Sequence, residues 1–104
     1  TGTHDNDTAR GWFDHASDEE REAVLAYLGC DADEVPAGLI RAAYTSVAGT
    51  AVVPMQDVLG LGSEARMNTP GAETGNWTWR LPPGALTRED AARLKKLATL
   101  TGRA

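Results

Sequence analysis

The chain has 104 residues, of which 15 are acidic and 10 basic, and its formal charge is -5. This length provides the core of at most one domain, and 41% hydrophobic residues suffice for a folded chain. The acidic balance excludes a nucleic-acid partner of the phosphate-binding kind, and no apolar stretch approaches the roughly 20 residues of a membrane span. We therefore expect neither nucleic acid nor membrane as a partner. With Cys30 as the single cysteine, the default location is cytoplasmic.

A first helix is predicted over residues 18–28. Ser17 stands three positions before Glu20, the spacing at which a hydroxyl and a carboxylate each bond the other's backbone N–H at a helix start. Apolar residues then recur at helical spacing, and Gly29 is placed to adopt the left-handed conformation that ends a helix.

A second helix is predicted over residues 37–48, because Pro36 suits a first helical turn and an apolar face continues until Gly49. The short apolar run 50–53 is rich in β-branched residues and is bounded by Gly49 and Pro54. This pattern predicts a strand covered on both faces in a parallel sheet, which needs neighbouring strands.

The stretch from Gly60 to Gly84 has five glycines, three prolines and two tryptophans but no helical or strand period. A connection beyond about 12–15 residues without structure usually has a function, so this loop is a candidate site. Thr87 and Asp90 then repeat the capping-box spacing, which predicts a last helix ending near Gly102. The order of elements predicts an α/β chain, mostly helical with one or two short strands and a long polar loop, that is part of an α/β barrel.

A dense polar cluster occupies residues 4–8, where two carboxylates, an imidazole and an amide lie within four positions. Such a cluster can direct several polar atoms at one ligand. It can equally form an Asx-type turn in which Asp5 or Asp7 caps a following segment. No metal is expected, because the spacing matches neither a calcium loop nor a zinc site.

Further polar candidates lie before and within the long loop. Gln56 and Asp57 follow the predicted strand, where ligand-facing residues of a barrel lie, although Asp57 can instead cap the loop. Glu64 and Arg66 are expected to form an ion pair that fixes the loop. Asn68 is then freer to bind a ligand.

Two tryptophans, Trp77 and Trp79, would face the same side of an extended segment, where aromatic faces can pack on sugar rings; core packing is the more common role of tryptophan. Carboxylates, amides and tryptophans in long loops favour a carbohydrate site. A small carbohydrate-binding or partner-binding module that uses Trp77, Trp79 and Asn68 without chemistry is the alternative. A structural tail without a ligand is a third hypothesis, which the long polar loop disfavours.

The segments THDNDT, VVPMQDVLGLGSEARMNTPG and GNWTWR resemble the C-terminal part of the 4-alpha-glucanotransferases, also called amylomaltases or disproportionating enzymes. The resemblance runs from Thr1 to about Arg80 with the spacing of both blocks intact. Family members are several times longer and are built on a (β/α)8 barrel. The resemblance therefore implies that residues 1–104 are a partial domain, the C-terminal segment of that catalytic barrel.

The resemblance implies a retaining double displacement that transfers a segment of an α-1,4-glucan to glucose or to another α-1,4-glucan. Asp5 resembles the third carboxylate of the family, which stabilises the transition state, and His4 resembles an imidazole that binds hydroxyls of the transferred sugar. Asn68 is expected to bind substrate. The nucleophile and the acid/base belong to sequence upstream, so the chain alone is expected to be inactive. No cofactor is implied, the partner is a maltodextrin, and the isolated chain is expected to self-associate.

Overall fold

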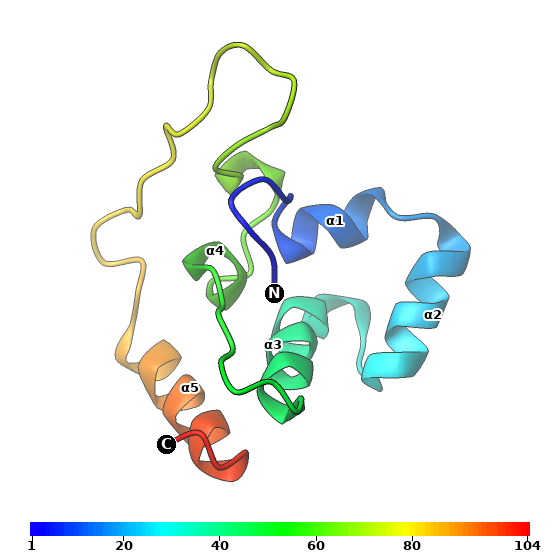
Figure 1. Ribbon diagram of the computed structural model, residues 1–104, viewed down its shortest axis with the longest axis vertical. Helices are drawn as coiled ribbons and strands as arrows, with labels where there is room; N and C mark the ends of the chain where they lie inside the picture. Colours follow the sequence, from blue (N-terminus) through cyan, green and yellow to red (C-terminus); the bar gives the residue numbers. More distant parts are fainter.

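The computed structural model describes all residues 1–104 and contains helices and loops but no strand (Figure 1). The helices are α1 (Ala9–His15), α2 (Asp18–Leu28), α3 (Val35–Thr45), α4 (Met55–Val58) and α5 (Arg88–Leu100), with two short 3-10 helices, η1 (Ala32–Glu34) and η2 (Ser63–Ala65). The first three α-helices form one side of the molecule, whereas the segment after η2 runs outward and returns along the other side to α5 (Figure 1). The prediction of a mostly helical chain with a long loop is confirmed.

Both predicted capping boxes are present. Ser17 Oγ accepts a hydrogen bond from the Glu20 amide at 3.2 Å, and the Glu20 carboxylate accepts one from the Ser17 amide at 2.9 Å. Gly29 ends α2 in the left-handed region with φ 64°, so the bounds 18–28 are confirmed. At the start of α5, the backbone and hydroxyl hydrogen bonds from Thr87 hold the pKa of Asp90 below its ordinary value.

The second predicted helix is found with shifted ends. It spans residues 35–45 instead of 37–48, with Pro36 in its first turn as predicted. It ends early because Ser46 adopts an extended backbone, and the Ser46 hydroxyl donates to a carbonyl of the last turn at 2.8 Å. Competition of this kind between a serine side chain and the helical backbone is a common way for a helix to end.

The strand predicted over residues 50–53 is absent, and with it the one or two strands expected of the α/β class. A strand is stabilised by a ladder of bonds to a neighbour, whereas residues 50–53 have a single such bond, from the Thr1 amino group to the Val52 carbonyl at 2.7 Å. Val52 is accordingly 70% exposed. Two short helices were not predicted, α1 and α4, because seven and four residues are too few to show a period.

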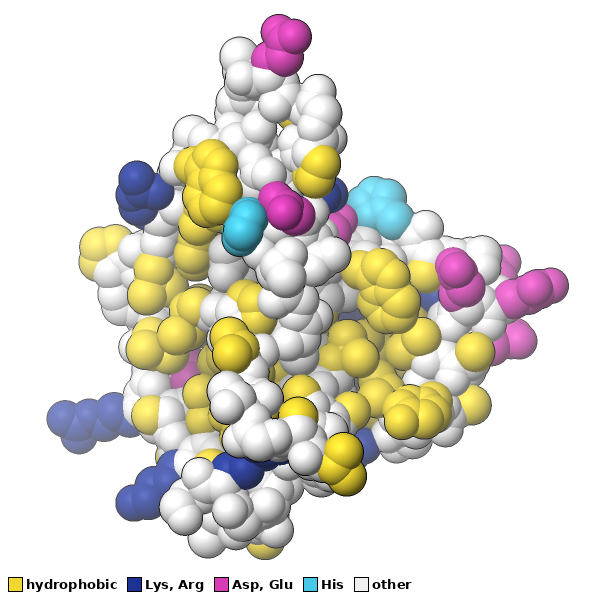
Figure 2. All heavy atoms as spheres, viewed as in Figure 1, with side chains coloured by type: hydrophobic (Ala, Val, Ile, Leu, Met, Phe, Trp, Pro, Cys, Tyr) yellow, Lys and Arg dark blue, Asp and Glu magenta, His cyan; other side chains and the backbone are white.

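The core lies where α1, α2 and α3 meet, around Phe13, Leu28 and Val35. Only 12 of the 104 residues are buried, and hydrophobic side chains spread openly over the face seen in Figure 2. The radius of gyration is 14.3 Å, whereas a compact domain of about 100 residues has about 13 Å. The chain is thus more open than an independent domain of its length. None of its helices is long and apolar enough to cross a membrane.

Candidate functional site

Two loops that are far apart in the sequence meet just before α1. The Asn68 amide donates to the His4 carbonyl at 3.1 Å, and Asn68 Nδ2 donates to Asp5 Oδ1 at 2.7 Å. His4 Nε2 lies 3.4 Å from the same carboxylate oxygen. All three predicted site residues are therefore brought together. Asp5 Oδ2 has no hydrogen bond to the protein, so one carboxylate oxygen remains available to a ligand.

An aromatic ring completes this cluster. The rings of His4 and Trp77 lie with centroids 4.9 Å apart and an interplanar angle of 41°. Trp77 has φ 60°, a left-handed conformation that costs an L-residue roughly 1–2 kcal/mol. A hydrogen bond from its amide to the Met67 carbonyl at 2.7 Å holds it there. Trp77 is 53% exposed and Trp79 is half-buried, so neither tryptophan is packed in a core.

The predicted ion pair between Glu64 and Arg66 is wrong. The Glu64 carboxylate accepts from the Gly62 amide at 3.0 Å. Arg66 instead donates from Nε to the Asn68 carbonyl at 2.8 Å and from Nη2 to the Asp5 carbonyl at 2.7 Å. The loop is fixed in this way because two carbonyls converge on the planar guanidinium, which donates to both at once.

The polar pair after the predicted strand, Gln56 and Asp57, forms hydrogen bonds within the chain. Asp57 is 4% exposed, and its Oδ1 accepts from the amide of Ala9 at 2.8 Å, while Oδ2 accepts from the Thr1 hydroxyl. Gln56 Nε2 donates to the Ala65 carbonyl at 3.1 Å. The interpretation that Asp57 caps the loop is wrong, because its carboxylate bonds the start of α1 and Thr1 instead.

The cap of α1 differs from the one that the turn interpretation of the polar cluster predicts, which is Asp5 or Asp7. Thr8 is the N-cap and accepts from the Gly11 amide at 3.0 Å. Asp7 accepts from the Thr8 amide through Oδ1 and from the Ser63 hydroxyl through Oδ2, each at 2.8 Å. Asp7 therefore ties the polar cluster to η2, and Asp5 is left to face outward.

A cavity of about 520 Å³ lies between the N-terminal loop and the segments around α4 and Met67, and of the three predicted site residues only His4 lines it. His4, Arg66 and Trp77 are among its lining residues. Ligand sites commonly have volumes of about 300–1,000 Å³, so this cavity has room for a sugar unit. Figure 2 shows acidic side chains beside both histidine side chains on this face. No group of three or more His, Cys, Asp or Glu side chains is arranged to hold a metal ion.

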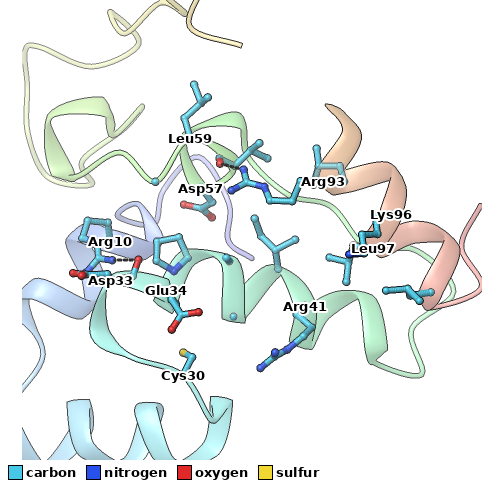
Figure 3. Close-up of a pocket in the computed structure, with 18 residues that line it drawn as sticks. Arg10, Cys30, Asp33, Glu34, Arg41, Asp57, Leu59, Arg93, Lys96 and Leu97 are labelled. Carbon is cyan, nitrogen blue, oxygen red and sulfur yellow. Dashed lines mark hydrogen bonds between the residues drawn. The ribbon is translucent and has the colours of Figure 1, made fainter. Parts of the chain in front are cut away.

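A second cavity, of about 570 Å³, lies between α3, α4 and α5 (Figure 3). Its arginines are engaged with the main chain: Arg93 donates to the Val58 carbonyl at 2.7 Å and Arg10 to the Asp33 carbonyl at 3.0 Å. None of the three predicted site residues lines it. The cavity is therefore a gap between helices, separate from the site.

Comparison with known proteins shows which family the chain resembles. A family model described as 4-alpha-glucanotransferase matches residues 1–87. A 4-alpha-glucanotransferase of Thermus thermophilus is 50% identical over 109 residues, covering 99% of this chain and 22% of that protein. A chloroplastic/amyloplastic 4-alpha-glucanotransferase of Solanum tuberosum is 52% identical over 98 residues, covering 93% of this chain and 17% of that protein.

Among solved structures, an amylomaltase from Streptococcus agalactiae in complex with acarbose matches with a TM-score of 0.94 at 33% identity, covering 100% of this chain and 21% of that chain. The chain therefore belongs to the 4-alpha-glucanotransferase family, and the resemblance of its motifs is confirmed. It spans about a fifth of the length of the curated relatives it matches.

Proposed function

We propose that residues 1–104 are a partial domain, the C-terminal segment of the (β/α)8 catalytic barrel of a 4-alpha-glucanotransferase, called here the parent enzyme. The relatives are about five times longer, which supports this proposal. The low number of buried residues, 12 of 104, supports it as well, because apolar faces remain for a larger core to cover. In such a barrel, residues 50–53 would gain the neighbouring strands that this chain lacks.

The proposed reaction transfers a segment of an α-1,4-glucan to glucose or to another α-1,4-glucan with retention of configuration. Retaining enzymes break the glycosidic bond through an oxocarbenium-like transition state, in which positive charge develops at the sugar. A fixed carboxylate stabilises that charge more than it stabilises the neutral substrate. Asp5 is proposed to be this carboxylate, whereas the nucleophile and the acid/base would come from other parts of the parent enzyme.

One observation carries the assignment: Asp5, His4 and Asn68 lie within hydrogen-bonding range of one another, and His4 lines a cavity. Asn68 donates to one oxygen of the Asp5 carboxylate and leaves the other oxygen for the sugar. The His4 side chain is 56% exposed, so its ring can reach sugar hydroxyls. These contacts favour a catalytic site over the alternative, a small binding module, in which Asn68 would have no carboxylate to orient.

The replacement Asp5→Asn in the parent enzyme tests this proposal. It keeps the shape and removes the charge, so turnover should fall by about 10³-fold or more while maltodextrin binding changes little. Asp14→Asn is a matched control, because Asp14 is an exposed carboxylate on α1 whose ion-pair partner is Arg10 at 3.7 Å. Equal losses of turnover and binding would instead make Asp5 a ground-state ligand.

The chain alone is proposed to be inactive and to self-associate. It would lack two of the three carboxylates, so incubation with maltotriose should give no disproportionation. Its exposed apolar side chains include Tyr27 at 86% and Leu100 at 74%, and such surfaces promote association, which light scattering would detect. No cofactor is proposed, and the partner is the α-1,4-glucan. A cytoplasmic location stays a proposal, since the Solanum tuberosum relative is chloroplastic/amyloplastic.

A further inference from the structure

We propose that Arg66 is a positioning residue for the reaction, which holds the Asp5 carboxylate against the Asn68 side chain by binding the main chain of both residues. The inference rests on the proposed function of Asp5. Arg66 donates from Nε to the Asn68 carbonyl at 2.8 Å and from Nη2 to the Asp5 carbonyl at 2.7 Å. One guanidinium thus joins two loops whose bonded residues are 63 positions apart.

The two bonds fix more than the distance between the loops. Nε and Nη2 lie in one rigid plane, so both carbonyls must keep a set direction to be bonded together. Bonds from a charged donor are roughly twice as strong as neutral ones. Because the Asp5 carbonyl and carboxylate belong to the same residue, a turn of that peptide unit swings the carboxylate away from Asn68.

None of the remaining contacts between the loops bonds the Asp5 carbonyl, which only Arg66 holds. The Asn68 side chain bonds only the Asp5 carboxylate, which is 52% exposed and open to competition from water, and so does not hold the Asp5 main chain. The other direct links are the backbone bond from the Asn68 amide to the His4 carbonyl, the bond from the Ser63 hydroxyl to Asp7, and the contact between the His4 and Trp77 rings. Neither loop is part of a β-sheet, in which pairing with a neighbouring strand would fix the positions of its residues.

Arg66 contacts carbonyl groups rather than the carboxylate, so it acts through Asp5. A misplacement of about 1 Å in a reacting group can lower the rate about 10²-fold. We therefore expect Arg66→Ala in the parent enzyme to lower kcat by about 10–100-fold while KM changes less than about threefold. Arg66→Lys should lower kcat about tenfold, because an ammonium group lacks the planar fork that fixes both carbonyls.

A matched control is available in Arg103, which also donates to main-chain carbonyls distant in sequence, those of Tyr44 at 2.7 Å and Ala48 at 2.8 Å. It follows α5, its side chain reaches the segment at the end of α3, and it does not line the cavity of His4 and Trp77. Arg103→Ala should lower the melting temperature while kcat stays within twofold. Added methylguanidinium should restore kcat of Arg66→Ala at least fivefold and leave the Arg103→Ala variant unchanged.

A double-mutant cycle shows whether Arg66 acts through Asp5. In an Asp5→Asn background, followed by its residual turnover, Arg66→Ala should cost less than about threefold, because the carboxylate it positions is gone. An equal loss in both backgrounds overturns the inference, as does kcat within twofold of the wild type for both Arg66→Ala and Arg66→Lys.

If Arg66→Ala is unfolded at the assay temperature, the cycle is run with Arg66→Lys and the same criteria apply. Retained turnover in Asp5→Asn overturns the proposed function together with this inference. Loss in Asp5→Asn with unaffected Arg66 variants overturns this inference alone.

Discussion

The helical side of the molecule, α1 to α3, and the loop side, residues 60–87, are held by different forces. Phe13, Leu28 and Val35 pack in the helical side, where apolar burial is the main stabilising contribution. The loop side has few buried residues and is held by Arg66, whose side chain reaches main-chain carbonyls. Burial is non-directional, whereas a hydrogen bond fixes an angle, so the geometry of the proposed site depends on the loop side.

The helical side meets the rest of the molecule at the start of α1, where side-chain hydrogen bonds connect it to α4 and η2. Asp57 accepts from the Ala9 amide, and Asp7 accepts from the Ser63 hydroxyl. The same helix buries Phe13 in the core. Movement of α1 would therefore be transmitted from the helical core to the loop that carries Asp5.

The largest effect on stability is expected from shortening a side chain in the core of the helical side. Val35 is fully buried, so Val35→Ala removes two methyl groups' worth of contact and should destabilise the helical side by about 1–3 kcal/mol. Val47→Ala is the control, because Val47 is fully exposed and should change stability by less than about 0.5 kcal/mol. Urea unfolding monitored by circular dichroism measures the stability of both variants. Equal midpoints would contradict the statement that apolar burial stabilises the helical side.

A second replacement targets the junction between the two sides. A Cβ built on Gly11 would lie 2.5 Å from Asp7 Oδ1 and closer still to the Ser63 hydroxyl, so in Gly11→Ala either these two side chains or α1 must shift and the Asp7–Ser63 bond is disturbed. We expect a loss of about 1–3 kcal/mol in the free energy of unfolding, and a fall in kcat of the parent enzyme. Gly49→Ala has open space around its Cβ and should leave both quantities unchanged. A fully active, equally stable Gly11→Ala would show that the junction does not couple the sides.

The smallest effect concerns the capping box of α5, which flanks the loop side. Because hydrogen bonds from Thr87 lower the pKa of Asp90 in the folded chain, the stabilisation is present above the unfolded pKa and is lost as pH falls through the folded one. Asp90→Asn should therefore melt lower than the wild type at pH 7, and the gap should shrink below about pH 4. Glu89→Gln is the matched control, because Glu89 lies in the same helical turn but takes no part in the capping box. A constant gap for Asp90→Asn down to pH 2 would contradict the assignment.

The parts that were predictable from sequence are those with local causes. The helix α2 follows from Ser17, Glu20 and Gly29, residues that contact one another within a single helix. The strand over 50–53 was predicted wrongly because its stability depends on neighbouring strands that the sequence of this chain does not contain. Sequence patterns describe local preferences more reliably than they describe pairing with distant segments.

The candidate site divides in the same way. His4 and Asp5 stand out because of their dense polar cluster, and Asn68 because of its place in the long loop. Arg66 was assigned to its sequence neighbour Glu64, although its partner Asp5 lies 61 positions away. No local pattern reveals that a guanidinium will bind a distant carbonyl, since the acceptor is a main-chain group that every residue has.

Amide hydrogen exchange in the parent enzyme tests most directly the claim that Arg66 holds the two site loops together. The amide of Asn68 is bonded to the His4 carbonyl and that of Trp77 to the Met67 carbonyl, so both report on the loop side. Arg66→Ala is expected to accelerate exchange at these two amides about tenfold or more and to leave exchange at the amides of α2 unchanged. Unchanged exchange at Asn68 and Trp77, or an equal acceleration throughout α2, would contradict it.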